Sequence, residues 1–233
     1  MYIKLNNRLQ TVADMIEDGM AVVDVGTDHA YLPVYLALNK ECGKLIATDI
    51  NEQPLMRAAH TVYENDLRDR VELRLCDGLS GVEPEEVDCI VIAGLGGDTI
   101  ISVLDSAKWT ADSSKTLLLQ PMSRSENVRE YLLNNGFKIE KEKIAKDGNH
   151  LYTIMYVKYF TSEHKTYEEW YRYVGEVTEN RDELSRKYVS HQLDRLRTAA
   201  DGLMKSSNIE EIEKAGHINN IIATIKKRTG DLL

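Results

Sequence analysis

The stretch Asp24-Val25-Gly26-Thr27-Asp28-His29-Ala30 decides the fold, because it joins an apolar, strand-like run to a helical pattern at 30–39. Rossmann-type domains bind their ligand at such a turn from the first strand into the first helix. Dinucleotide-binding turns need a second glycine so that the backbone can approach a pyrophosphate, and here Asp28 occupies that position. Its carboxylate would repel a phosphate but attract the sulfonium and ammonium cations of S-adenosylmethionine (AdoMet). The turn therefore favours AdoMet over a nicotinamide dinucleotide, and it makes Asp24 and Gly26 candidate cofactor contacts.

Apolar, β-rich runs alternate with helical patterns from residue 20 to about residue 158. Several runs are nearly continuous in valine, isoleucine and leucine, which is typical of parallel strands covered on both faces. The last two runs are separated only by the loop 146–149, which predicts an antiparallel hairpin at the end of the sheet. We therefore expect an α/β catalytic domain, residues 1–160, with the Rossmann-like seven-stranded sheet of AdoMet methyltransferases. The strands are expected at 21–25, 45–49, 71–75, 87–93, 116–119, 137–140 and 151–157, and the helices at 30–39, 52–65, 97–106 and 124–135.

The pattern changes after Lys158, and residues 161–233 form the second predicted domain. Apolar residues recur there at helical steps in two stripes, which are separated by the turn and N-cap Ser206-Ser207-Asn208. Two helices with apolar stripes and a short connection predict an antiparallel, α-helical coiled-coil hairpin. The simplest interpretation is that this arm only packs. The stripes contain Val189, Leu193, Leu196, Ala200 and Leu203, then Ile209, Ile212, Ile218, Ile221, Ile222 and Ile225.

Acidic residues also follow the second and third expected strands. Asp49, with Ile50 beside it, comes about 25 residues after Asp24, where a carboxylate accepts hydrogen bonds from both ribose hydroxyls of a nucleoside. Asp77 and Gly78 end the third strand and place an acceptor, with room beside it, near an adenine amino group. Each aspartate alone is more often a helix cap or a loop acid. Three aspartates at successive strand ends of one sheet favour a cofactor site.

The turns after the fourth and fifth strands supply two further candidates. The fourth strand runs into Ala93-Gly94-Leu95-Gly96-Gly97-Asp98, without the N-P-P-Y motif that argues for methylation of the exocyclic adenine nitrogen. Its glycines leave room for a base or a cofactor to approach the backbone at Gly94, although a plain left-handed turn is the alternative. Gln120 offers donors and an acceptor to the edge of a base. The alternative is that Gln120 ties down a neighbouring loop.

The composition limits the class of protein. The chain has 233 residues, of which 42% are hydrophobic and 29% charged, as in a globular protein. The net charge of −9 argues against a general polyanion binder, so any contact with nucleic acid has to be local. No apolar run approaches the ~18–20 residues of a membrane span, and no signal sequence is recognisable. The cysteines lack a metal-binding or disulfide spacing, so we expect a cytoplasmic protein with neither a membrane nor a metal partner.

Four motifs in order resemble those of the bacterial tRNA (adenine-22-N1)-methyltransferase family. They are Leu5-Asn6-Asn7-Arg8-Leu9, Asp24-Val25-Gly26-Thr27-Asp28-His29-Ala30-Tyr31-Leu32-Pro33, Ile92-Ala93-Gly94-Leu95-Gly96-Gly97 and Leu119-Gln120-Pro121. The resemblance covers about residues 3–158, and the helical tail resembles the family's coiled-coil arm in pattern and position only. It implies methyl transfer from AdoMet to N1 of an adenine in the D-arm of tRNA, with S-adenosylhomocysteine as the product. Family members often carry asparagine after Gln-Pro, where this chain has Met122.

The implied reaction assigns roles to individual residues. Adenine N1 attacks through a lone pair, so positioning supplies most of the rate, and the product is a cationic base. A carboxylate would stabilise the growing charge, which makes Asp28 the candidate catalytic group, with Gln120 orienting the base. Arg8 is expected to pair with the AdoMet carboxylate or a tRNA phosphate; a plain surface arginine is the alternative. The segment 181–197 is positive by two on an acidic protein, so we expect the arm to hold tRNA phosphates.

A function other than catalysis remains an alternative. A non-catalytic, Rossmann-like module would bind a nucleotide or RNA and use its helical arm for partners. The missing N-P-P-Y motif and the acidic bulk of the chain support this alternative. Calorimetry with AdoMet, S-adenosylhomocysteine and NAD separates the alternatives, and no protein partner is implied.

Overall fold

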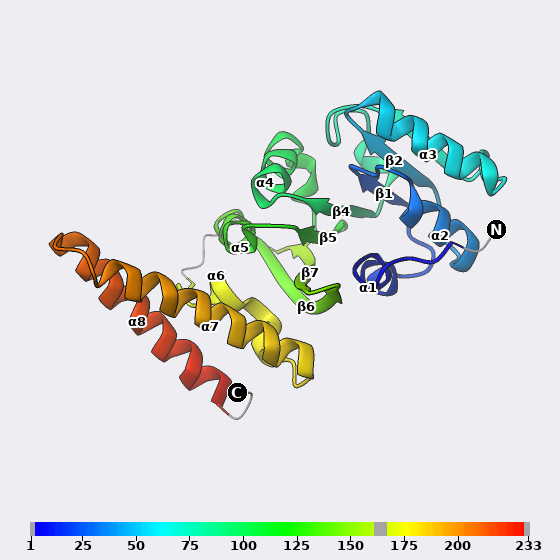
Figure 1. Ribbon diagram of the computed structural model, residues 1–233. Helices are drawn as coiled ribbons and strands as arrows, with labels where there is room; N and C mark the ends of the chain where they lie inside the picture. The colour runs from blue at the N-terminus through cyan, green and yellow to red at the C-terminus, as the bar shows by residue number, and fades with distance from the viewer. Residues whose placement is uncertain (1–2, 161–166, 231–233) are drawn as a thin grey trace.

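The computed structural model describes residues 3–160 and 167–230, and a seven-stranded sheet lies at its centre (Figure 1). The strand order is β3-β2-β1-β4-β5-β7-β6. Strands β1 to β5 pair in parallel, whereas β7 is antiparallel to both β5 and β6. The predicted Rossmann-like α/β sheet with a closing antiparallel hairpin is confirmed. Its strands are β1 (Val22–Val25), β2 (Leu45–Asp49), β3 (Val71–Leu75), β4 (Cys89–Leu95), β5 (Thr116–Pro121), β6 (Phe137–Asp147) and β7 (His150–Tyr159).

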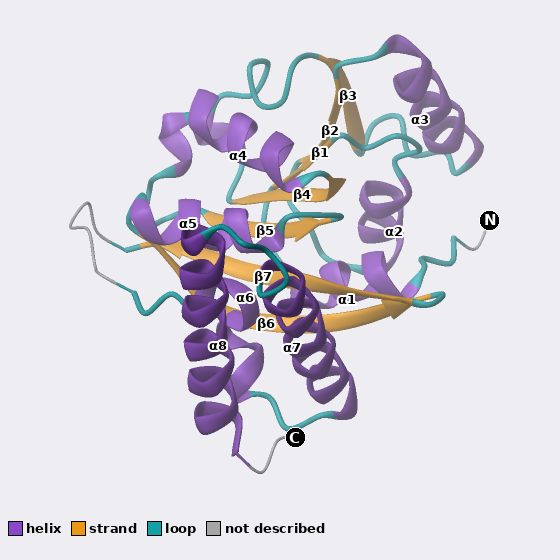
Figure 2. Cartoon of the chain, turned by 60° about the vertical axis from the view of Figure 1, so that its left-hand side comes forward, coloured by secondary structure: helices purple, strands orange, loops and turns teal. Residues whose placement is uncertain are grey.

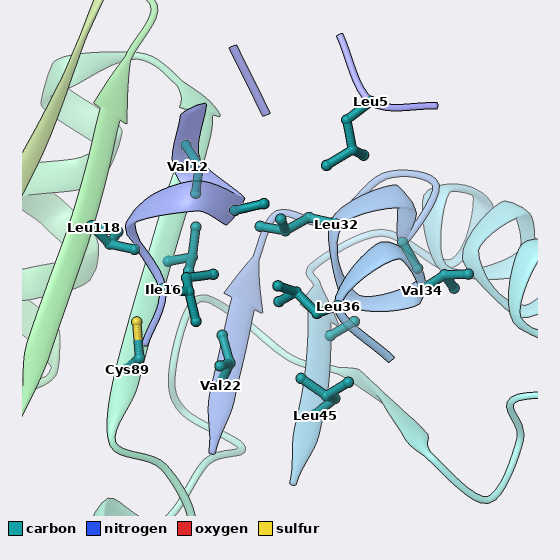
Figure 3. Packing of buried hydrophobic residues seen from close by; sticks show 14 of the residues in the cluster. Leu5, Val12, Ile16, Val22, Leu32, Val34, Leu36, Leu45, Cys89 and Leu118 are labelled. Carbon is teal, nitrogen blue, oxygen red and sulfur yellow. The ribbon is translucent and has the colours of Figure 1, made fainter. Parts of the chain in front are cut away.

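Helices cover both faces of the sheet (Figure 2). Neighbouring residues of a strand point to opposite faces, so Val22 packs in one apolar core and Val23 in the other. Figure 3 shows the first core, where Ile16 and Leu36 lie on either side of Val22. One face carries α1 (Asn7–Met15), α2 (Tyr31–Asn39) and α3 (Glu52–Glu64), and the other carries α4 (Gly97–Ser106) and α5 (Ser125–Asn134). Short 3₁₀ turns lie at Pro84–Glu86 and Lys108–Thr110.

Helix α1 has no counterpart among the helices expected from the sequence. It begins after Asn6, whose side-chain oxygen accepts a hydrogen bond from the Leu9 N–H at 2.9 Å and so caps the first turn. The helix buries Val12, Ala13 and Met15 against the sheet. Its first turn thereby fixes Arg8 near the carboxyl edge of the strands, where the predicted site lies.

The predicted helical hairpin is confirmed after residue 167. It consists of α7 (Glu183–Leu203) and α8 (Ile209–Thr229), and α6 (Tyr171–Val174) and a 3₁₀ turn (Gly175–Glu179) precede it. That the two helices form a coiled coil stays a prediction. Most of the predicted stripe is buried between α7 and α8, but Ile209 is 72% and Ile212 39% exposed. The prediction was wrong for these two residues, because they lie at the tip, where α7 has already ended. Within the described ranges 3–160 and 167–230, no helix is both long and apolar enough to cross a membrane.

The arm packs against the sheet through a buried polar network. Arg129 of α5 and Glu142 of β6 form an ion pair with an Nε–Oε1 distance of 2.9 Å, and neither side chain is exposed. Arg129 Nη2 also donates to the hydroxyl of Tyr188 on α7 at 3.1 Å. Ile144 of β6 joins the apolar cluster of the arm. Separation of the chain at the predicted boundary, 160/161, would uncover this ion pair; residues 161–166 lie outside the described residues.

Candidate active site

The turn between β1 and α2 contains three residues in the left-handed region. The φ angle is +75° at Gly26, +52° at Asp28 and +53° at Ala30. A Cβ atom on Gly26 would lie 3.1 Å from Cδ2 of Leu95, so both its conformation and its space favour glycine. Left-handed non-glycine residues cost about 1–3 kcal/mol each and concentrate where a protein binds a ligand. Two such residues within one turn make this turn a candidate site.

Asp24, one residue before the end of β1, has a buried carboxylate. Its Oδ2 accepts a hydrogen bond from the hydroxyl of Thr27 at 2.6 Å. Burial raises the pKa of Asp24 to about 6, although the Thr27 hydrogen bond and the positive charge of Arg8 oppose the shift. A carboxylate that is costly to ionise in this way is suited to receive a cationic ligand group.

Asp28, the predicted catalytic residue, lies beside the hollow with more than half of its side chain exposed. One of its oxygens accepts hydrogen bonds from both Nε and Nη2 of Arg57, on α3. The other lies 3.7 Å from Nε2 of His29. Arg57 was not predicted as a site residue, and no sequence pattern connects it to Asp28. The Asp28 carboxylate is thus held by a cation on one side and approached by a ring nitrogen on the other.

Asp49 ends β2 and Ile50 follows it, between the ends of β1 and β3. The Asp49 carboxylate accepts hydrogen bonds from the N–H of Asn51 at 2.9 Å and of Asp28 at 3.4 Å. These bonds fix a nearly buried acid on the edge of the sheet, with lone pairs left for a ligand. Ile50 is 60% exposed, so an apolar side chain lies open beside this carboxylate.

Asp77 and Gly78 follow β3 as predicted. Gly78 has a φ of +57°, and its carbonyl accepts a hydrogen bond from the hydroxyl of Thr48 at 3.0 Å, which ties the loop after β3 to β2. Asp77 is exposed, and both residues line a hollow of about 500 Å³ beside α4. The third aspartate therefore lies at the same edge of the sheet as the first two.

Gln120 does not present its side chain to the solvent. It is fully buried, its Oε1 accepts a hydrogen bond from Arg8 Nη1 at 2.5 Å, and its Nε2 donates to the Pro121 carbonyl at 2.9 Å. The contacts favour the alternative interpretation, in which Gln120 ties down a neighbouring segment instead of orienting a base. The segment it holds is α1, because Arg8 lies on that helix.

The position of Arg8 also accounts for the absence of a side chain at Gly94, near the end of β4. Gly94 has a φ of +92°, and a Cβ atom there would lie 3.3 Å from Arg8 Nη1. Burial lowers the pKa of Arg8, partly offset by the charge of Asp147. Gly97 has a different reason, since a Cβ atom would lie only 2.7 Å from the Ser123 carbonyl oxygen. Gly97 thus has a packing reason of its own, and the expectation that it makes room for a ligand stays a prediction.

A hollow of about 290 Å³ gathers five of the predicted residues, namely Arg8, Asp24, Gly26, Asp28 and Gly94. Asp49 and Ile50 lie at the strand end between it and the hollow of Asp77 and Gly78. Thr27 and Tyr31 line the first hollow but were not predicted as site residues. Both lie in or directly after the turn 24–30, and this position in the motif could have identified them as site residues.

The strand order and the acidic carboxyl edge define a Rossmann-like methyltransferase domain. The chain belongs to the family described as "Methyltransferase domain", which matches residues 5–155. This family membership and the enzymes named below support the enzymatic interpretation over the non-catalytic one.

The chain is similar to characterised tRNA-modifying proteins. It is 35% identical over 153 residues to the tRNA (adenine(22)-N(1))-methyltransferase of Bacillus subtilis, a match that covers 66% of this chain and 64% of that protein. The crystal structure of the B. subtilis m1A22 tRNA methyltransferase TrmK superposes with a TM-score of 0.86 at 25% identity, over 98% of this chain and 100% of that one. M. capricolum TrmK in complex with S-adenosylhomocysteine gives 0.79 at 26% identity, over 99% of both chains. The structural likeness thus includes the helical arm.

Proposed function

We propose that this chain is an AdoMet-dependent tRNA methyltransferase that modifies N1 of adenine 22 in the D-arm. The observation that carries the proposal is the row of three aspartates, Asp24, Asp49 and Asp77, at successive strand ends of one sheet. The relatives named above act on tRNA or hold S-adenosylhomocysteine, and their likeness supports the same cofactor and substrate. A tRNA substrate also implies that the protein acts in the cytoplasm.

The residues of the carboxyl edge fit AdoMet along its length. Asp24 is a buried carboxylate suited to the ammonium group, and Arg8, in the same hollow, is suited to the carboxylate of the methionine half. Asp49 would accept from the ribose hydroxyls, while Ile50 gives the adenine an apolar surface. Asp77, with Gly78, would face the adenine amino group. The backbone at Gly26 and Gly94 allows close approach to the cofactor.

The chemistry at adenine needs few groups from the protein. When bound, AdoMet supplies an electrophilic methyl group, and adenine N1 attacks it without prior deprotonation. The residues of the chain therefore position the base and stabilise the charge that develops on it. We assign the second task to Asp28, whose carboxylate Arg57 holds in place. Gln120 acts as a positioning residue that holds Arg8.

We further propose that the arm, residues 161–233, binds the phosphates of tRNA outside the target base. Ion pairs within the protein reduce the positive potential of segment 181–197, because three of its five cations pair with carboxylates. The pairs are Lys187 with Glu183, Arg195 with Glu126 and Arg197 with Asp194. Lys226 and Lys227, exposed on the last turn of α8, add positive charge on the returning helix. Since phosphate contacts dominate affinity for nucleic acid, these two lysines are the sharper test.

The arm is tested by charge reversal in the full chain. We expect Lys226→Glu with Lys227→Glu to weaken tRNA binding and to lower its log–log salt slope by about two, with AdoMet affinity unchanged. Arg68→Glu with Arg70→Glu is the matched control, since both residues are exposed and precede β3, at the opposite edge of the sheet from the arm. Wild-type tRNA affinity in the lysine variant would make the arm a structural element.

The function itself is tested by incubation of the full chain with bulk unmodified tRNA and methyl-labelled AdoMet. After digestion to nucleosides, the label is expected in 1-methyladenosine. The Asp49→Ala variant should incorporate less label at limiting AdoMet. Label in another nucleoside would change the assigned substrate atom. An absence of label at saturating AdoMet would refute the proposal.

A further inference from the structure

Two stacked rings lie beside the first hollow of the candidate active site. The rings of His29 and Tyr31 have centroids 5.0 Å apart and planes inclined by 4°. Tyr31 lines the hollow together with Gly26, Asp28 and Gly94, and 44% of it is exposed. A large aromatic side chain is therefore held parallel to a second ring while part of its surface stays open to solvent.

The strained turn is what holds the two rings together. Asp28 and Ala30, on either side of His29, are both left-handed, with φ angles of +52° and +53°. The N–H groups of His29 and Ala30 both donate to the Thr27 carbonyl, at 2.7 and 3.1 Å, and close the turn. This backbone brings residues 29 and 31 onto one side of the turn. Strain of this kind persists where it positions a functional group.

An open aromatic ring beside a methyl-transfer site matches the chemistry of a nucleobase. An enzyme that modifies a base atom takes the base out of its helical stack and receives it between aromatic or apolar side chains. Stacking on one aromatic side chain contributes a factor of about 5 to 150 in affinity for each base.

We infer that Tyr31, whose ring is held parallel to that of His29, is the stacking platform for the target adenine. The inference rests on the proposed function, because it gives the base of that reaction a binding surface. His29, which also lines the hollow, acts as a positioning residue, since its ring stacks on that of Tyr31. A base stacked on Tyr31 lies over the hollow that contains Asp24 and Gly94, and so faces the methyl donor.

The platform is tested with a series of variants of the full chain. Tyr31→Ala is expected to lower kcat/KM for unmodified tRNA by about 5- to 150-fold, whereas Tyr31→Phe, which keeps the ring, stays within about twofold of wild type. AdoMet affinity, measured by calorimetry, should change in neither variant. Tyr63→Ala is the matched control, because Tyr63 is an exposed tyrosine on α3, away from the hollow, and its loss should leave kcat/KM unchanged.

A second measurement reports the stacking without methyl transfer. Transcripts with 2-aminopurine at position 22 lose fluorescence when that base stacks on a ring. With S-adenosylhomocysteine present, wild type and Tyr31→Phe should quench the signal of bound transcript more strongly than Tyr31→Ala.

The outcomes separate the platform from the proposed function. An active wild type with a fully active Tyr31→Ala variant, or with equal quenching by the two Tyr31 variants, overturns the platform alone. Equal losses of AdoMet affinity and rate in Tyr31→Ala would place the ring against the cofactor instead. A wild-type chain that methylates no tRNA overturns the proposed function, and the platform with it.

Discussion

Replacement of Asp49 by alanine is expected to weaken AdoMet binding by about 10- to 150-fold. The carboxylate is nearly buried at the end of β2, and its oxygens already accept hydrogen bonds from the N–H groups of Asn51 and Asp28. A second lone pair on each oxygen can accept from a ribose hydroxyl. Loss of two charge-assisted hydrogen bonds to a ligand corresponds to roughly 1.5–3 kcal/mol of binding free energy.

Calorimetry on the full chain with AdoMet and S-adenosylhomocysteine measures this loss. Both ligands carry the same ribose, so their affinities should fall by the same factor. Asp88→Ala is the matched control, because Asp88 also accepts a backbone hydrogen bond, from the Ala21 N–H at 2.9 Å, but lies just before β4, at the amino ends of the parallel strands and away from the candidate site. Unchanged AdoMet affinity in Asp49→Ala, or an equal loss in Asp88→Ala, would refute the ribose assignment.

Three further predictions concern the site and the arm. Because the raised pKa of about 6 leaves Asp24 mostly protonated at pH 5, AdoMet affinity should rise up to about tenfold between pH 5 and 7, and Asp24→Asn should abolish that rise in calorimetric titrations. Asp28→Asn should lower single-turnover methylation at least about tenfold with little change in AdoMet affinity; a fully active variant removes Asp28 from the site. Arg129→Met leaves the Glu142 carboxylate buried without its ion-pair partner and should lower the free energy of unfolding in urea by about 3–5 kcal/mol, of which Glu142→Gln in the same chain should recover part.

The predictable part of the fold is the part set by local pattern. Apolar runs, some continuous and some alternating with charged residues, located all seven strands, and the turn after β1 located the carboxyl edge at which the three aspartates lie. The first helix was missed, because Asn7–Met15 is short and mixes polar residues with three buried ones. The first strand of the closing hairpin was predicted too short: it was expected at 137–140, but β6 continues to Asp147. The outward side chains of β6 are charged, so no apolar run in the sequence shows where the strand ends. Polar surface residues carry little information about where an edge strand ends.

Contacts between residues far apart in the chain could not be predicted from the sequence. The Arg8–Gln120 hydrogen bond joins residues 112 positions apart and favours a role for Gln120 in holding α1 over the predicted contact with a base. The pairing of Asp28 with Arg57 spans 29 positions and changes the electrostatic surroundings of the predicted catalytic acid. Neither pair follows a spacing rule, because each depends on how α1 and α3 pack across the end of the sheet.

Methylation of a single tRNA transcript tests the central proposal most directly. An unmodified transcript with adenine at position 22 and a matched transcript with guanine there are incubated with the full chain and AdoMet, and position 22 is read by reverse transcription, which stops at 1-methyladenosine. We predict a stop at position 22 of the first transcript and none in the second, together with one methyl group gained per molecule of the first by mass spectrometry. Equal methylation of both transcripts, or of neither, would contradict the assigned substrate.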